Sequence, residues 1–196
     1  YDHGDEINDV HPQATLSAIN RYGNPYAGGA VTARDDSYSS TGSRVFGHQY
    51  GPYWYDFVRM KIEFTDPVST VSIDVIADSY SGDQGKLEAY DAGGNLLETI
   101  VTPSMSRLDV KTMTVSRASA DVAYVVAYSG TYSSIRLDNL TFGDPEPSTV
   151  TDENGDYVFA DLAAGDYVVR EVAPEGYRQT YPSVAPRHRV FAVPND

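Results

Sequence analysis

The sequence contains no cysteine, and it has few basic side chains for its 196 residues. The absence of cysteine excludes disulfide bonds, thiolate metal ligands and a thiol nucleophile. Lysine and arginine together number 14 against 28 aspartates and glutamates, so the formal net charge is −14. Because a chain this acidic repels phosphate backbones and anionic lipids, nucleic acid is not expected as a partner.

Long apolar segments are also missing. No run approaches the ~18 apolar residues that a membrane helix needs, so we expect no membrane span. Hydrophobic residues nevertheless make up 41% of the chain and aromatic residues 12%, which is enough for a folded core. With 16 Tyr and 16 Gly, the composition is typical of a secreted acidic β-protein. No apolar signal segment precedes Tyr1, so we expect a mature chain or part of a longer one.

Short alternating segments, bounded by Gly, Pro, Asn and Asp, recur along the chain. Val71, Ile73 and Val75 alternate with Ser72 and Asp74, a period of two that indicates a half-buried strand. The same reasoning predicts about ten strands before residue 143. They lie at or near 14–19, 30–34, 43–46, 56–64, 71–75, 87–89, 96–101, 110–115, 122–128 and 135–142. So many short strands in one core predict a two-sheet sandwich or jelly roll, and an all-β fold class.

A proline-rich segment at 144–148 interrupts this pattern. Its two prolines flank an acidic residue and favour a stiff, extended linker. We therefore predict a first domain at 1–143, a linker at 144–148 and a second β-domain at 149–196. Both parts of the chain are acidic: residues 1–143 contain 10 basic and 18 acidic residues, and residues 144–196 contain 4 basic and 10 acidic residues.

The last predicted strand of the first domain changes phase. Ile135 and Leu137 share one face, whereas Leu140 and Phe142 share the other. A slip of this kind predicts a β-bulge, which would turn the Asp138 carboxylate sideways off the sheet.

Residues 58–143 resemble a jelly-roll module of secreted bacterial proteins, related in shape to carbohydrate-binding modules. The stretches that carry the resemblance are 62–74, 87–97 and 135–142. The resemblance implies that Asp138, with oxygens from an N-terminal loop, can hold a structural Ca²⁺. Asp35 and Asp36 are the candidate loop ligands, since calcium takes six to eight hard oxygens. The alternative is that Asp138 caps the bulge or pairs with an arginine.

The segment 47–55 concentrates aromatic side chains and holds the only Trp of the chain. Tyr50, Tyr53, Trp54 and Tyr55 could stack on sugar rings, because flat aromatic surfaces with polar tips suit a wet binding site. They could also anchor a protein partner. The third interpretation is that they plug the end of the sandwich.

Residues 151–177 resemble the middle of a collagen-adhesin B-type repeat, an immunoglobulin-like sandwich of bacterial surface adhesins and pilins. Asn154-Gly155 predicts a turn with positive φ, and Gly165 predicts another. Between and after these turns, Tyr157 and Phe159 alternate inward, as do Tyr167 and Val169.

The resemblance begins in the middle of the repeat, because the linker runs directly into Thr149. A partial sandwich leaves an apolar face wet and a strand edge unpaired. Three completions are open: the N-terminal segment 1–20 returns, the tail lies on the first domain, or another copy donates a strand. The third is head to tail, and such contacts produce filaments when they do not close.

Catalytic motifs are missing. His3, His11, His48 and His188 are scattered, and no H-E-x-x-H, G-x-S-x-G or P-loop pattern occurs. We expect a non-enzymatic, extracellular or cell-surface bacterial protein that is structural or adhesive and polymerises with itself. The alternative is a carbohydrate-binding accessory module whose partner is a polysaccharide.

Overall fold

The computed structural model describes residues 1–9, 11–79, 82–143, 149–150, 152–154 and 156–159, with the backbone of 166–169 and 188–191. The chain divides into two compact units, Tyr1–Pro145 and Glu146–Asp196. Within the described residues, no helix has the length and hydropathy of a bilayer-spanning segment.

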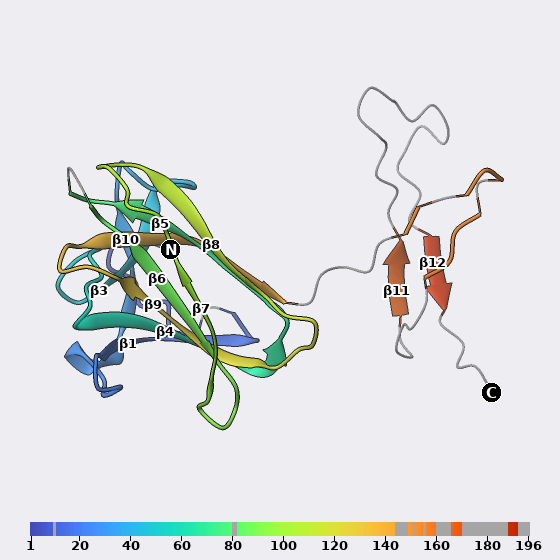
Figure 1. The fold of residues 1–196 in the computed structure, drawn as a ribbon, viewed down its shortest axis with the longest axis horizontal. Coiled ribbons are helices and arrows are strands. Elements are labelled where there is room, and N and C mark those ends of the chain that lie inside the picture. Colours follow the sequence, from blue (N-terminus) through green and yellow to red (C-terminus); the bar gives the residue numbers. More distant parts are fainter. Residues whose placement is uncertain are drawn as a thin grey trace. The chain divides into compact units, whose positions relative to one another are not determined.

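The first unit is a sandwich of two five-stranded antiparallel sheets (Figure 1). The first sheet has the order β1 (Ala14–Asn20), β4 (Val58–Val68), β9 (Val122–Ser129), β6 (Gly85–Tyr90) and β7 (Leu96–Val101). The second has the order β2 (Val31–Asp35), β3 (Arg44–His48), β10 (Ile135–Gly143), β5 (Thr70–Ala77) and β8 (Val110–Ser116). A single 3-10 turn, η1 (Ala27–Gly29), lies between β1 and β2. The predicted all-β sandwich is confirmed.

The strand order is that of a jelly roll with two added edge strands. The chain changes sheet at nearly every connection, which places β3-β10-β5-β8 against β4-β9-β6-β7. β1 extends the first sheet by pairing with β4, and β2 extends the second by pairing with β3. Only β6 and β7 form a hairpin within this eight-stranded set, through the turn that contains Gly93 and Gly94.

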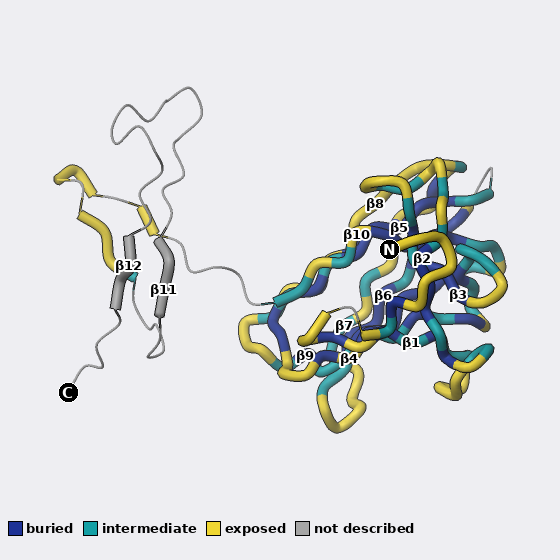
Figure 2. The backbone as a smooth tube through the Cα atoms, turned by 180° about the vertical axis from the view of Figure 1, so that it is seen from behind, coloured by how far each residue is buried: buried dark blue, intermediate teal, exposed yellow. Residues whose placement is uncertain are grey.

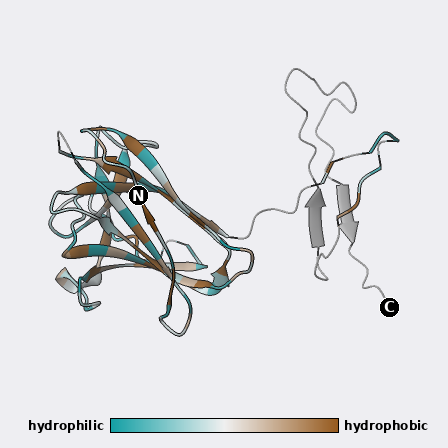
Figure 3. Ribbon diagram, in the orientation of Figure 1, coloured by the Kyte–Doolittle hydropathy of each residue, from teal (hydrophilic) through white to brown (hydrophobic). Residues whose placement is uncertain are grey.

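Period-two alternation places the core between the sheets, as the burial and hydropathy colouring shows (Figures 2 and 3). In β4, Val58, Met60 and Ile62 are at most 1% exposed, whereas the intervening Arg59 and Lys61 lie on the outer face. Each fully buried aliphatic side chain contributes about 1.5–3 kcal/mol. The hydrophobic pattern therefore determines which face of each strand points outward.

The predicted bulge in β10 is confirmed. The register between β10 and β5 shifts between Asp138 and Thr141. Asn139 takes a positive φ of 50°, a conformation that Asn tolerates better than most residues. Asp138 and the opposite Asp74 are both buried on the outer side of the second sheet.

The C-terminal unit contains one antiparallel ladder in the described residues, β11 (Asp166–Val169) with β12 (His188–Phe191). Tyr167 and Val169 lie on β11, but their side chains are outside the described part. Residues 156–159 form no strand, contrary to the prediction, and the Tyr157 side chain is 43% exposed rather than buried. Its ring makes an edge contact with Phe159.

The N-terminal strand belongs to the first sandwich. β1 pairs along its whole length with β4, from Ala14 opposite Phe64 to Asn20 opposite Val58. Its Leu16 and Ala18 side chains lie in the core of that sandwich.

Candidate binding surface

Two of the three aspartates predicted to bind calcium form ion pairs with arginines. Asp35 Oδ1 lies 2.8 Å from Arg44 Nε, and Asp36 forms an ion pair with the buried Arg136. No group of three or more His, Asp and Glu that could hold a metal ion occurs in the described part of the chain. The structure therefore does not bring the three predicted ligands together, and calcium binding stays a prediction.

The third, Asp138, is tied to the loop between β2 and β3. Thr41 donates its backbone N–H to Asp138 Oδ2 at 2.9 Å. The Ser40 hydroxyl lies 3.0 Å from the same oxygen and 2.8 Å from Asp74 Oδ2. Asn139 donates its side-chain amide to Asp74 at 3.1 Å. These contacts fit the alternative interpretation, in which Asp138 stabilises the bulge and the loop over it.

Trp54 is a core residue and does not offer a face to a sugar. Its side chain is fully buried, and its indole Nε1–H donates to the Phe46 carbonyl at 2.9 Å. The His48 ring packs edge-on against it at 5.3 Å. For Trp54, the expectation of a ligand-stacking ring is wrong and the plug interpretation holds.

The three tyrosines of this segment differ in exposure. Tyr50 is 71% exposed, whereas Tyr53 and Tyr55 are half-buried. Tyr53 lies under the Arg136 guanidinium at 4.9 Å, and Tyr55 stacks on Phe57 at 5.0 Å. The four rings therefore do not form one flat platform.

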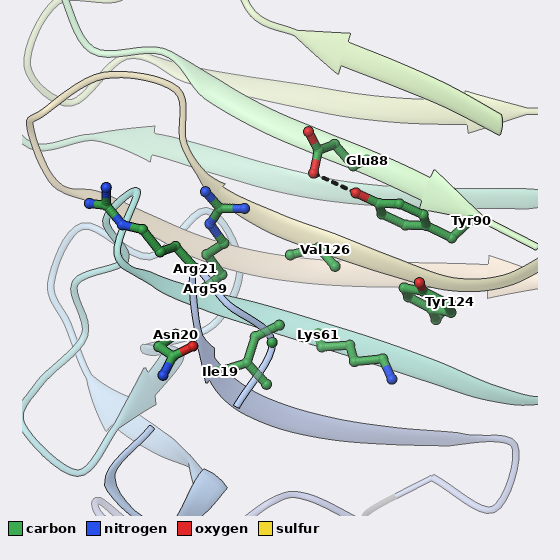
Figure 4. A pocket seen from close by; sticks show the side chains of 10 residues that line it. Ile19, Asn20, Arg21, Arg59, Lys61, Glu88, Tyr90, Tyr124 and Val126 are labelled. Atoms are coloured by element: carbon green, nitrogen blue, oxygen red, sulfur yellow. Dashed lines mark hydrogen bonds between the residues drawn. The ribbon is translucent and has the colours of Figure 1, made fainter. Parts of the chain in front are cut away.

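A hollow of about 240 Å³ lies on the outer face of the first sheet (Figure 4). Strands β1, β4, β9 and β6 and the turn after β1 supply its walls. Its lining is polar, cationic and aromatic: Ile19, Asn20, Arg21, Gly23, Arg59, Lys61, Glu88, Tyr90, Tyr124 and Val126.

Two tyrosines and a lysine form a row across three neighbouring strands. Tyr90 of β6 stands opposite Tyr124 of β9, and their rings stack at 4.8 Å with an interplanar angle of 7°. Lys61 Nζ of β4 lies 4.5 Å from the Tyr124 ring centre. Because β6 and β4 flank β9 on opposite sides, Tyr90 and Lys61 cover the two faces of Tyr124.

A second row runs parallel to the first. The Arg59 guanidinium lies 3.9 Å from the Tyr128 ring centre, and Lys86 Nζ approaches the same ring at 5.4 Å. A cation over an aromatic face gains about 0.5–2 kcal/mol, depending on desolvation. The Tyr128 ring thus stabilises the positions of the Arg59 and Lys86 side chains on the outer face of the sheet.

Glu88 is the anionic centre between the rows. The hydroxyls of Tyr90 and Tyr128 donate to its two oxygens at 2.8 and 2.9 Å, and Lys86 Nζ lies at 2.7 Å. Burial raises the pKa of the Glu88 carboxyl, but these three donors outweigh burial and hold that pKa below its ordinary value. Burial and the Glu88 carboxylate both raise the pKa of Tyr90, so its hydroxyl keeps its proton.

Two arginines close the end of the hollow near the β1–η1 turn. Arg21 Nη2 lies 3.1 Å from Asp56, and Arg59 donates to the Asp56 carbonyl and carboxylate at 2.7 and 2.6 Å. Asp56 therefore positions both guanidinium groups at the rim.

A second hollow of about 380 Å³ adjoins the first. The two share Ile19, Gly23 and Lys61 in their linings. The second extends over β1 toward η1 and the segment around Asn8. The two adjoining hollows together are the depression of the first sheet.

The sequence reasoning did not identify this surface. Its residues come from β1, β4, β6 and β9, which are distant in sequence and adjacent only through the strand order. The available signal was a charged or aromatic residue at several outward positions of β4, β6 and β9, namely Arg59, Lys61, Glu88, Tyr90 and Tyr124.

The SpaA family, described as a prealbumin-like fold domain, matches residues 120–184. The match covers about a third of the chain and includes β9 and β10 of the first unit as well as part of the second. It supports the resemblance of the C-terminal residues to a B-type repeat. No curated protein matches the chain.

Two solved structures are similar to the chain at low identity. One is the K2 cleaved adhesin domain of Lys-gingipain, with 14% identity, a TM-score of 0.41, and coverage of 72% of this chain and 92% of that one. The other is the enzymatically active domain of bacteriophage CBA120 tailspike protein 4, with 13% identity, a TM-score of 0.39, and coverage of 71% and 21%. Likeness at this level says nothing about function.

Proposed function

We propose that this chain is a non-enzymatic structural or adhesive protein of the bacterial surface, whose copies assemble head to tail by strand complementation. The observation that carries the proposal is the β11–β12 ladder. These are the only strands among the described residues of Glu146–Asp196. Two strands by themselves are at best marginally stable in water, so addition of a strand to the β11–β12 ladder would stabilise it.

Two other observations support the proposal. The prealbumin-like match reaches into this unit, through residue 184. The N-terminal strand β1 is paired with β4 and contributes to the first core, which favours another copy as the source of an added strand. Addition of a strand from a neighbouring copy would satisfy the backbone groups along an open edge of the ladder.

Sedimentation velocity of the full chain, from low to high micromolar concentration, tests the assembly. We expect a series of species that lengthens with concentration. Val168→Pro removes a backbone N–H within β11, opposite Arg189, and should abolish the series. Val158→Pro is the matched control, because Val158 is 76% exposed and outside the ladder. A monomer at every concentration would refute the proposal.

A carbohydrate-binding role is the second candidate. The depression on the outer face of the first sheet favours it, since ligand sites are concave surfaces with a few placed polar groups. This role is compatible with adhesion, because a surface protein can assemble through one unit and bind through the other.

A further inference from the structure

The depression on the first sheet gathers basic side chains in a strongly acidic protein. Its first hollow is lined by three cations, Arg21, Arg59 and Lys61, and by one carboxylate, Glu88, which pairs with Lys86 and accepts hydrogen bonds from two tyrosines. Asp56 pairs with both arginines, and Glu63 pairs with Lys61 at 2.9 Å. What these cations offer a ligand is therefore the N–H donors that the neighbouring carboxylates leave unused.

The aromatic rings do not offer open faces to a neutral sugar. Tyr90 covers one face of Tyr124, and Lys61 covers the other. The Tyr128 ring is similarly covered by Arg59. Sugar stacking needs a free π face, so recognition in this hollow depends on the cationic tips that the rings support.

The cations retain donors for a ligand carboxylate. A guanidinium carries five N–H groups, and Asp56 accepts from two nitrogens of Arg59. Arginine pairs with carboxylates through two parallel hydrogen bonds, which gives both strength and direction. Lys61 is in the lining of both hollows, and Glu63 takes one of its three N–H donors at 2.9 Å, so two remain.

The shape of the depression favours an extended chain. Two adjoining hollows share three lining residues, so one polymer can occupy both. A protein partner would instead need a large patch with an apolar anchor, and the two apolar side chains of the first lining, Ile19 and Val126, are half-buried and buried.

We propose that this depression binds a carboxylate-bearing polysaccharide, with Arg21, Arg59 and Lys61 contacting uronate groups of successive sugars. The proposal deepens the adhesive part of the proposed function and rests on it. It names the class of ligand and the residues that would distinguish an acidic glycan from its neutral counterpart.

Calorimetric titration of the full chain tests it with oligosaccharides of galacturonate, alginate and hyaluronan, in buffer that contains EDTA. The matched ligand control is the methyl-esterified galacturonate oligosaccharide, which has the same sugar chain with neutral methyl esters in place of the carboxylates. We expect at least one acidic oligosaccharide to bind and the ester to bind at least about tenfold more weakly, since it lacks the charge-assisted hydrogen bonds of the carboxylate.

Lys61→Gln and Arg21→Gln should each weaken binding about fivefold to tenfold. Lys111→Gln, an exposed site on β8 of the other sheet, is the matched protein control and should bind as the wild type does. Circular dichroism and the melting temperature of each variant verify that it is folded.

Absence of binding to all three acidic oligosaccharides would overturn the proposal. So would equal binding of acid and ester, or equal loss in Lys61→Gln and Lys111→Gln. If Lys61→Gln instead abolishes self-association, the occupant is a second copy and the polysaccharide proposal is wrong. Sedimentation of the unliganded wild type separates these outcomes from failure of the assembly proposal, because a monomeric wild type could still bind the acidic oligosaccharide.

Discussion

Trp54 illustrates how one residue type can serve either a binding site or a core. Its sequence context, a polar loop rich in tyrosine, favours exposure, yet the side chain is fully buried beneath His48. Burial follows from the bridge that Trp54 forms with Ile135, which brings the indole N–H to the Phe46 carbonyl.

Trp54→Ala should therefore act on stability. We expect it to lower the free energy of unfolding by about 3–5 kcal/mol, because it leaves a large cavity. Tyr50→Ala, at a ring that is 71% exposed in the same loop, should change it by less than about 0.5 kcal/mol. Urea denaturation measures both. Equal, small effects would show that Trp54 is not a core residue.

The pH dependence of stability tests the charged centre on the first sheet. The pKa of Glu88 is held below its ordinary value, so its contribution is present above the pKa of an unfolded glutamate and is lost as the pH falls through the lowered, native value. Glu88→Gln should lower the free energy of unfolding at neutral pH by about 1.5–3 kcal/mol. The acid limb of its stability profile should be flatter than that of the wild type. An unchanged acid limb would contradict this assignment.

At the scale of single elements, the close approach of the two sheets limits what β6 can contain. A Cβ built on Gly85 would lie 2.8 Å from both Cγ atoms of Val75 and 2.9 Å from Met113 Sδ. Both neighbours are fully buried residues of the facing sheet, so they cannot move aside freely.

Gly85→Ala should consequently destabilise the sandwich by about 1–3 kcal/mol through overpacking. Gly130→Ala is the control, because its Cβ would meet Gln84 at an ordinary distance of 3.6 Å. Thermal unfolding of the two variants measures the difference. If Gly85→Ala were as stable as Gly130→Ala, the glycine would not be required by sheet packing.

The strands of the first unit could be predicted because their signals depend only on residues that are close together in the sequence. Alternation and turn residues located all ten strands, and the phase change after Leu137 located the bulge at Asp138 and Asn139. The prediction failed at residues 156–159, where the alternation of Tyr157 and Phe159 is not accompanied by a strand. Alternation shows which residues could share a face, whereas a strand also needs a paired neighbour.

At the scale of the whole molecule, the negative net charge opposes the proposed assembly. Residues 1–143 carry 10 basic and 18 acidic side chains, and residues 144–196 carry 4 basic and 10 acidic ones. Copies of such a chain repel each other at long range, so assembly by strand pairing depends on short-range hydrogen bonds and on screening by salt. The sedimentation experiment on assembly therefore belongs at physiological ionic strength.

The sequence alone determined the all-β class, the positions of the strands, the bulge and the acidic character, because each depends on composition or on neighbouring residues. Only the tertiary structure decided that Trp54 is buried, that Asp35, Asp36 and Asp138 have separate partners, and that Lys61, Glu88, Tyr90 and Tyr124 meet on one face. The physical reason is that these relations depend on which strands are neighbours in a sheet, and strand order is set by the packing of the complete core.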